Sequence, residues 1–319
     1  TGSRHARPMR LCRFAQGSVV RAGFYFDSTL VPLDAAVRVH RERTHQEVAL
    51  PAGDDLLALL PGGSHSAAAR ELGGWLATNR GAADGAALAV DKVQLLTPIP
   101  RPPKIILLAG NYNEHIKEGG GQATERAKTF PYLFQKPPTT TLNHPGAPIA
   151  IPKVSPNHID WECELGVVMA KRCKAVKEPD ALGYVAGYTV VNDISDRKFR
   201  PNLGREKREK DTFFDWQHGK WHDTFCPVGP CVASAQALPD PQKLGLTLKV
   251  NGKTWQNAST AQMIFPVAAI IEFVSAIVTL EPGDIIVTAQ KRSERLQDVP
   301  IAVSVLSGDA IAAKGAVNL

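Results

Sequence analysis

The stretch Asp160-Trp161-Glu162-Cys163-Glu164-Leu165, read together with the later pair Asn192-Asp193, contains the acidic residues around which the chain is organised. Apolar residues on both sides of this stretch indicate an extended segment. Because side chains two apart in a strand point to the same face, we expect Glu162 and Glu164 on one face. Two carboxylates on one face repel each other, so they either face water or bind a cation.

A third carboxylate follows another apolar run. Residues 185–191 predict a buried strand that ends just before Asp193. Three carboxylates offer hard oxygen ligands, which suit Mg²⁺, Mn²⁺ or Ca²⁺ better than Zn²⁺. Glu162, Glu164 and Asp193 are therefore the candidate metal ligands. The alternative is a solvated strand edge with one acid that happens to follow it.

Five motifs in the same order resemble the fumarylacetoacetate hydrolase (FAH) family over residues 104–288. They are a strand with Gly110-Asn111-Tyr112-Asn113-Glu114-His115-Ile116-Lys117-Glu118, then Pro131-Tyr132-Leu133-Phe134-Gln135-Lys136-Pro137, Trp161–Leu165, Gly187–Arg197 and Gly219–Pro230. One such motif would be weak evidence for the resemblance, whereas five in the same order are specific evidence. The resemblance implies an α+β, mainly β fold: an FAH-like mixed β-sandwich roll as catalytic domain, with a small β-rich N-terminal domain.

The resemblance also implies roles for residues in these motifs. His115 and Glu118 are three apart and share a face of a helical turn. In the family such a pair deprotonates water, because the carboxylate orients the imidazole and raises its basicity. The predicted catalytic residues are His115, Glu118 and Lys220. The predicted substrate-binding residues are Tyr112, Lys136, Arg197 and Gln290. A lysine taken alone is more often a solvated side chain.

The activity that the resemblance implies is divalent-metal-dependent cleavage, as a hydrolase or lyase, of a C–C bond in a 2-oxo or 2,4-dioxo acid. Acylpyruvates and fumarylacetoacetate-like acids are examples, and a metal-stabilised enolate carries the reaction. The expected cofactor is Mg²⁺, with Mn²⁺ or Ca²⁺ as alternatives. The expected partners are a small oxo acid and a second copy in a homodimer. Two alternatives stay open: an isomerase or decarboxylase of aromatic compound catabolism, of the 2-hydroxyhepta-2,4-diene-1,7-dioate type, and a catalytically impaired metal-binding relic.

The composition narrows the class of protein. A chain of 319 residues that is 44% hydrophobic can build a sizeable core, while its apolar runs are too short to cross a bilayer. The N-terminal residues lack the apolar core of a signal peptide. Five scattered cysteines form no disulfide framework and predict a reducing, cytoplasmic location. The net charge of +6 comes without a nucleic-acid motif and favours acidic small molecules. We therefore expect no nucleic-acid or membrane partner.

Four segments are predicted along the chain. They are an extension or cloning scar at 1–8, a small N-terminal domain and linker at 9–100, the FAH-like catalytic domain at 101–288, and an atypical C-terminal tail at 289–319. The elements predicted within them are helices at 54–60 and 67–78, a hairpin with an Asn-Gly turn at 246–253, and a core helix within 263–280. The charged residues 197–215 predict either a lid or inserted helix over the site, or a solvated surface loop.

The tail departs from the family pattern at Ala289-Gln290-Lys291, where the family has Gly-Thr-Pro and a glycine-rich loop. Residues 287–309 instead resemble the start of the plug domain of TonB-dependent outer-membrane receptors, which indicates a chimeric join at Val287-Thr288. The alternative is that 301–305 form an unusual version of the family's last strand. Since glutamine is larger than threonine, Gln290 predicts a crowded substrate pocket and lowered activity.

Overall fold

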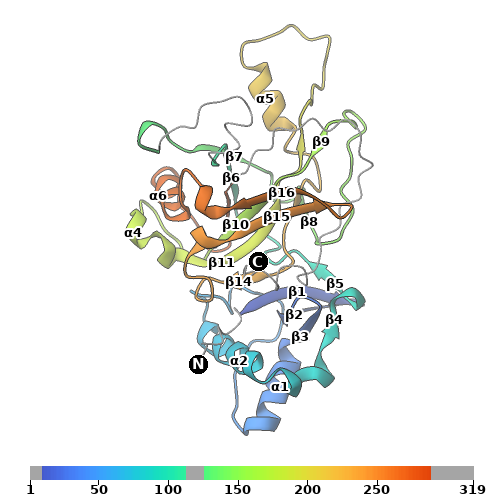
Figure 1. Ribbon diagram of the computed structural model, residues 1–319, viewed down its shortest axis with the longest axis vertical. Helices are drawn as coiled ribbons and strands as arrows, with labels where there is room; N and C mark the ends of the chain where they lie inside the picture. Colours follow the sequence, from blue (N-terminus) through green and yellow to red (C-terminus); the bar gives the residue numbers. More distant parts are fainter. Residues whose placement is uncertain (1–8, 113–125, 289–319) are drawn as a thin grey trace.

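The computed structural model describes residues 9–112 and 126–288. Its main feature is an 11-stranded mixed sheet with the order β4-β3-β2-β1-β14-β11-β10-β17-β6-β7, in which β5 also pairs with β1 (Figure 1). The strands of this sheet are β1 (Arg10–Gln16), β2 (Val19–Tyr25), β3 (Thr29–Pro32), β4 (Leu88–Ala89), β5 (Gln94–Leu96), β6 (Ile105–Ala109), β7 (Tyr132–Gln135), β10 (Cys163–Met169), β11 (Val185–Asn192), β14 (Val232–Ser234) and β17 (Ile285–Val287). The expectation of an α+β, mainly β fold is confirmed.

Helices are a minority and lie at the two ends and one side of the sheet (Figure 1). They are α1 (Leu33–Thr44), α2 (Ser66–Thr78), α4 (Glu178–Ala181), α5 (Asp211–His218) and α6 (Val267–Ile277). None of those in the described ranges 9–112 and 126–288 combines the length and apolarity that a membrane-crossing helix requires. The predicted helix at 67–78 is confirmed by α2, and α6 lies inside the predicted core helix at 263–280.

The prediction of a helix at 54–60 is wrong, because this segment forms turns. The Asp55 carboxylate accepts a hydrogen bond from the Leu57 backbone N–H at 2.9 Å, which offers the backbone a local alternative to helical pairing. The leucines that suggested a helix are nevertheless buried, with Leu56, Leu59 and Leu60 at most 1% exposed. Their spacing therefore reflected a core position and not helical periodicity.

Two strands in the middle of the sheet position the acidic residues. All residues of β10 are buried, as are most of β11, which fits their nearly continuous apolar sequences. The strands are antiparallel, and Cys163 pairs with Asn192 at one end of the ladder. This register places Glu162 and Glu164, on either side of Cys163, beside Asp193, which follows β11 directly.

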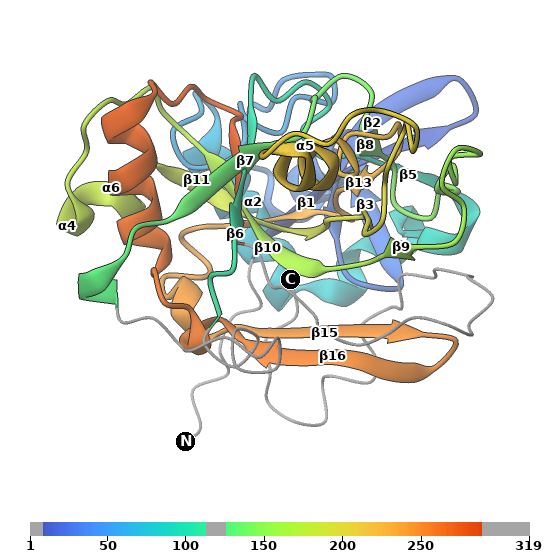
Figure 2. The same cartoon turned by 90° about the horizontal axis from the view of Figure 1, so that it is seen from above.

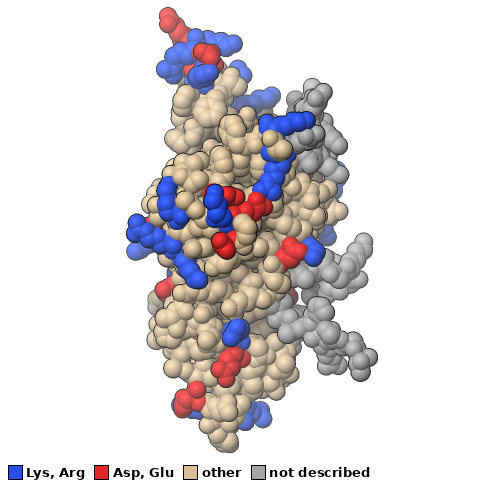
Figure 3. All heavy atoms as spheres, turned by 90° about the vertical axis from the view of Figure 1, so that its left-hand side faces the viewer, with Lys and Arg blue, Asp and Glu red and all other residues tan. Residues whose placement is uncertain are grey.

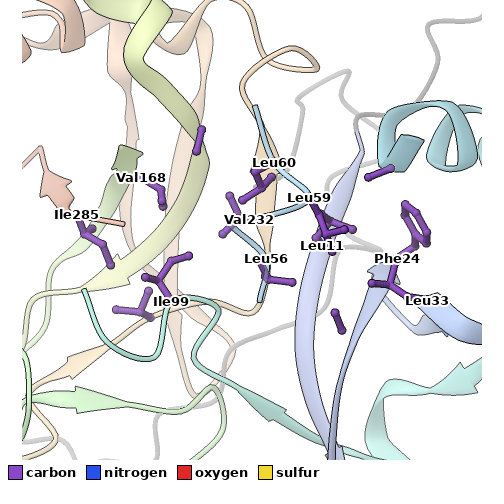
Figure 4. Packing of buried hydrophobic residues seen from close by; sticks show 14 of the residues in the cluster. Leu11, Phe24, Leu33, Leu56, Leu59, Leu60, Ile99, Val168, Val232 and Ile285 are labelled. Carbon is purple, nitrogen blue, oxygen red and sulfur yellow. The ribbon is translucent and has the colours of Figure 1, made fainter. Parts of the chain in front are cut away.

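The hydrophobic core runs through the sheet without a break between the N-terminal strands and the rest. Figure 4 shows Leu11 and Phe24 of the N-terminal strands in one cluster with Val232, Val168 and Ile285. Strand β1 also pairs directly with β14. Backbone pairing and the hydrophobic core both connect the residues before and after position 100. The division into domains at that position stays a prediction.

Six further strands form three separate two-stranded pairs. They are β8 (Leu142–Asn143) with β13 (Cys226–Pro227), β9 (Ile159–Asp160) with β12 (Ser195–Asp196), and β15 (Gly245–Val250) with β16 (Lys253–Ser259). The predicted hairpin is confirmed by β15 and β16, whose turn residues Asn251 and Gly252 have φ of 51° and 77°, as an Asn-Gly turn requires. Figure 2 shows this hairpin as a ribbon of its own beside the main sheet.

The charged segment at 197–215 combines the two structures that were predicted for it. Residues 201–210 are almost all exposed and irregular, and Figure 3 shows Lys and Arg gathered with acidic groups at the tip that this segment forms. Helix α5 follows and turns back toward the sheet. Its Trp216 ring packs against Phe134 of β7, with ring centroids 4.9 Å apart. The segment is thus a solvated loop joined to an inserted helix.

Candidate metal centre

The candidate metal ligands lie together at the ends of β10 and β11. Each of Glu162, Glu164 and Asp193 offers a carboxylate oxygen, and these atoms all lie within 4.8 Å of one another. The side chains are buried, with exposed fractions of 3%, 0% and 0%. The alternative of a solvated strand edge is therefore wrong for these three residues. Buried carboxylates in such proximity need positive charge nearby.

Backbone hydrogen bonds fix the relation between the two strand ends. The Asp193 N–H donates to the Glu162 carbonyl oxygen at 2.9 Å. The Glu162 N–H in turn donates to the Asn192 side-chain oxygen at 3.1 Å. Both polar groups of the Glu162 backbone are thus held by Asp193 and its neighbour Asn192. The sequence predicted no role for Asn192, although an amide side chain at a strand end commonly binds neighbouring backbone groups.

Lys220 supplies positive charge to two of the three acids. Its ammonium group lies 2.9 Å from Glu162 Oε2 and also contacts Asp193 Oδ2, and its side chain is only 3% exposed. Burial alone would lower the pKa of Lys220, but attraction by Asp193 and Glu162 outweighs burial and raises it. Lys220 is thus held as a hydrogen-bond donor to both carboxylates.

Backbone carbonyl oxygens hold the ammonium group of Lys136. Its ammonium group donates to the carbonyl oxygens of Ile194, Lys220 and Phe225 at 2.7 to 2.8 Å, and it lies 2.9 Å from Asp193 Oδ1. An ammonium group has three N–H donors, and these four oxygens surround it. These contacts tie the connection between α5 and β13 to Asp193 and Ile194. The role in substrate binding that the sequence predicted for Lys136 stays a prediction.

The two ammonium groups also set the charge of Asp193. Burial would raise the pKa of this carboxyl, but Lys136 and Lys220 outweigh burial and hold the pKa at about 2. Asp193 is therefore an anion throughout the physiological range. An ionised carboxylate is what a divalent cation requires of a ligand.

Arg197 bridges Asp160 at the end of β9 and Glu162, which lies just before β10. Its Nε donates to Asp160 Oδ2 at 2.9 Å, and its Nη2 donates to Glu162 Oε1 at 2.6 Å. The sequence predicted no role for Asp160, although it lies in the acidic stretch with Glu162. The guanidinium group thus orients Glu162 from one side while Lys220 does so from the other. Binding of a substrate carboxylate by Arg197 stays a prediction.

The donor set fits a hard divalent cation. All three convergent ligand groups are carboxylates, the ligands that Mg²⁺, Mn²⁺ and Ca²⁺ prefer. Asp160, Glu162, Glu164 and Asp193 outnumber the neighbouring cations Lys136, Lys220 and Arg197 by one, so the cluster carries an excess of negative charge. A divalent cation bound by all three ligands would change the net charge of these groups from −1 to +1.

The structure describes only one of the remaining predicted site residues, Tyr112. Tyr112 is 1% exposed and forms a β-bridge with Met263, while the side chain of Asn111 exchanges hydrogen bonds with the backbone of Phe265. His115, Glu118 and Gln290 lie outside the described residues. Their predicted roles are therefore not tested.

The cysteines near the site are unsuited to nucleophilic chemistry. All five cysteines of the chain are free and buried, as expected from their scattered positions. Burial raises the pKa of both Cys163 and Cys226 to about 12. Because the thiolate is the reactive form, these two buried residues are core thiols.

The chain is similar to a known protein family and to individual proteins. The family described as "Fumarylacetoacetate (FAA) hydrolase C-terminal" matches residues 104–313. A 2,4-didehydro-3-deoxy-L-rhamnonate hydrolase from Sphingomonas sp. (strain SKA58) is 38% identical over 212 residues, covering 66% of this chain and 69% of that protein. The family match extends past the proposed join at Val287-Thr288. The comparisons do not support the resemblance of the tail to a receptor plug.

Two solved structures have a similar fold. Maleylpyruvate hydrolase from Sphingobium sp. SYK-6, in complex with manganese(II) and pyruvate, has a TM-score of 0.59 and 29% sequence identity, covering 88% of each chain. A 2-hydroxyhepta-2,4-diene-1,7-dioate isomerase from Mycobacterium marinum has a TM-score of 0.58 and 28% identity, covering 88% of this chain and 86% of that one. The 88% of this chain that each similarity covers exceeds the residues of the family match, so both extend beyond that region.

Proposed function

This chain belongs to the fumarylacetoacetate hydrolase family, and from that membership we propose that it is a divalent-metal-dependent enzyme that cleaves a C–C bond in a small 2-oxo or 2,4-dioxo acid. The observation that carries the proposal is the buried cluster of Glu162, Glu164 and Asp193, whose ligand atoms converge within 4.8 Å. The similar Sphingobium enzyme, a maleylpyruvate hydrolase solved with manganese(II) and pyruvate, supports both the metal and the class of substrate.

Glu162, Glu164 and Asp193 would hold Mg²⁺ or Mn²⁺. When bound, such a cation supplies a Lewis acid that stabilises negative charge on oxygen atoms of the substrate. Lys136 and Lys220 keep Asp193 ionised, and Lys220 and Arg197 orient Glu162. An oxo acid is itself an anion, so positive side chains around the cluster also favour its approach.

Lys220 is the described side chain best placed to assist the chemical step. Its ammonium group is buried, charged and fixed beside Glu162 and Asp193. A fixed donor in a site shielded from water stabilises charge that develops in a transition state without having to reorganise. We assign Lys220 this electrostatic role. The activation of water by His115, oriented by Glu118, remains the prediction from the sequence.

An isomerase is the second candidate function. The similar protein from Mycobacterium marinum is a 2-hydroxyhepta-2,4-diene-1,7-dioate isomerase, which supports this alternative. Cleavage and isomerisation of such acids both need an oxyanion to be stabilised, and Lys220 would serve either reaction. They differ in whether a carbon–carbon bond is broken, so the products separate them.

The test is a screen of the metal-free protein with maleylpyruvate, acylpyruvates and oxaloacetate, before and after addition of Mg²⁺ or Mn²⁺. Loss of the enol absorbance is followed together with the amount of pyruvate released. We expect pyruvate from a dioxo acid only when the metal is present, and EDTA should abolish its release. Conversion of the substrate without a cleavage product would favour the isomerase. Equal turnover with and without metal would contradict both proposals.

Replacement of Lys220 tests its electrostatic role. We expect Lys220→Met to lower kcat by roughly 10²–10³-fold, the usual effect of removing one donor to a developing oxyanion. A matched control is Lys207→Met, which removes an exposed lysine from the charged loop. An unchanged kcat in Lys220→Met, with the metal bound as in the parent protein, would exclude this role.

A further inference from the structure

The residues that alternate with the metal-binding glutamates face the β15–β16 hairpin. Because neighbouring side chains in an extended segment point to opposite faces, Trp161 and Cys163 point away from the carboxylate face. Trp161 is 2% exposed and meets Trp255 of β16 edge to face, with ring centroids 6.1 Å apart. Val250 of β15 belongs to the same buried cluster. The hairpin thus packs on the back of the segment that carries the acids.

One side chain of the hairpin binds the backbone between the two glutamates. Gln256 accepts a hydrogen bond from the Cys163 N–H at 2.9 Å, and its amide nitrogen donates to the Cys163 carbonyl oxygen. Gln256 comes from β16, is 6% exposed, and lies 93 residues away in sequence. A single amide therefore satisfies both polar groups of the residue that joins Glu162 to Glu164.

These hydrogen bonds lie on the edge of β10 that β11 does not occupy. The backbone groups of successive strand residues point alternately to the two edges, and those of Glu162 are bound on the β11 side by Asn192 and Asp193. On the other side β17 pairs with residues 166–168, and the Thr288 N–H reaches only Leu165. At Cys163, the Gln256 amide takes the place of a neighbouring strand.

We propose that Gln256 is a positioning residue for the metal centre, which it serves by fixing the backbone that joins Glu162 to Glu164. With Asn192 on one edge and Gln256 on the other, that backbone cannot rotate without breaking hydrogen bonds. The relative position of the backbone atoms from which the two glutamate side chains start is thereby fixed before an ion binds. This inference rests on the proposed function, because it assigns Gln256 to the same metal centre.

The experiment measures Mn²⁺ affinity by calorimetry at 25 °C for the parent protein and for Gln256→Met. Methionine has a similar length but cannot form the two amide hydrogen bonds. We expect its dissociation constant for Mn²⁺ to rise by about 10–100-fold, as is usual when a group that orients a metal ligand is lost. A second variant, Gln256→Asn, keeps the amide but is one methylene shorter, and should weaken binding similarly even if Gln256→Met does not fold.

The matched control is Asn257→Ala, which removes an exposed amide from the next position of the same strand. We expect it to bind Mn²⁺ as the parent does. Variants of Gln256 that melt at a lower temperature without metal but retain the parent's Mn²⁺ affinity would overturn the inference, since Gln256 would then serve only the fold. If the parent itself fails to bind Mn²⁺, the proposed function is wrong, and that outcome is distinct from a failure of Gln256 alone.

Discussion

His144 shows how a single side chain makes the stability of this fold depend on pH. Its Nδ1 accepts a hydrogen bond from the Thr97 N–H at 3.0 Å, which requires that nitrogen to be unprotonated. Burial, and then the charge of Arg13, lowers the pKa of His144 below its ordinary value of 6.5. The folded state therefore binds a proton less readily than the unfolded chain.

The sign of this effect follows from the direction of the shift. The stability that His144 contributes is complete above pH 6.5 and is lost as the pH falls through the lowered pKa of the folded state. We expect the melting temperature of the parent to fall more between pH 8 and pH 5 than that of His144→Asn, whose side-chain oxygen accepts the same hydrogen bond but does not titrate. An equal decrease in both proteins would contradict this interpretation.

The acidic residues of the site could be predicted from the sequence, but their cationic partners could not be placed. The alternation of Glu162 and Glu164, with Asp193 after the next apolar run, is a local pattern, and the structure brings the three together. Lys136 reaches carbonyl oxygens 58 to 89 residues away along the chain. No local pattern encodes such contacts, and it was the family motifs that singled out Lys136 and Lys220.

At the scale of elements, close packing between strands is the feature most open to test. A Cβ atom on Gly187 of β11 would lie 2.6 Å from Val232 Cγ1 of β14, and closer still to the carbonyl oxygen of Ala233. Because backbone atoms cannot yield as a flexible side chain can, we expect Gly187→Ala to lower the free energy of unfolding by about 1–3 kcal/mol.

The control for this substitution lies four residues earlier in the chain. A Cβ atom on Gly183 would have no atom within 4 Å, and this glycine is exposed. Chemical denaturation of Gly183→Ala should give a free energy of unfolding within about 0.5 kcal/mol of the parent. If both variants lose the same stability, the contact between β11 and β14 is not as tight as the structure indicates.

Elements with strong local signals were predicted well, and elements shaped by distant contacts were not. Residues 185–191 form β11 as their continuous apolar sequence predicts, and Asn251-Gly252 forms the predicted turn. The leucines at 56–60 are spaced as in a helix, yet they reach the core from a segment that forms turns. Gln256 lies in the strand that follows the correctly predicted Asn-Gly turn, but nothing near it in sequence indicates that it binds Cys163.

At the scale of the whole molecule, the candidate metal centre lies where most of the fold meets. Its ligands follow or begin the two middle strands β10 and β11, and β11 is linked through β14 to β1 and the N-terminal strands. An ion bound to all three carboxylates would therefore join strands on which the entire sheet depends. Any ligand that binds only the folded state stabilises it in proportion to the logarithm of its concentration above the dissociation constant.

The central claim, that Glu162, Glu164 and Asp193 form one metal centre, is tested most directly by unfolding the metal-free protein with and without Mn²⁺. At a hundredfold excess over the dissociation constant, we expect the free energy of unfolding to rise by about 2.7 kcal/mol. Glu164→Gln should lose this increase, whereas Asp284→Asn, which alters a buried carboxylate outside the cluster, should keep it. An equal response to Mn²⁺ in the parent and in Glu164→Gln, or no response in the parent, would contradict the claim.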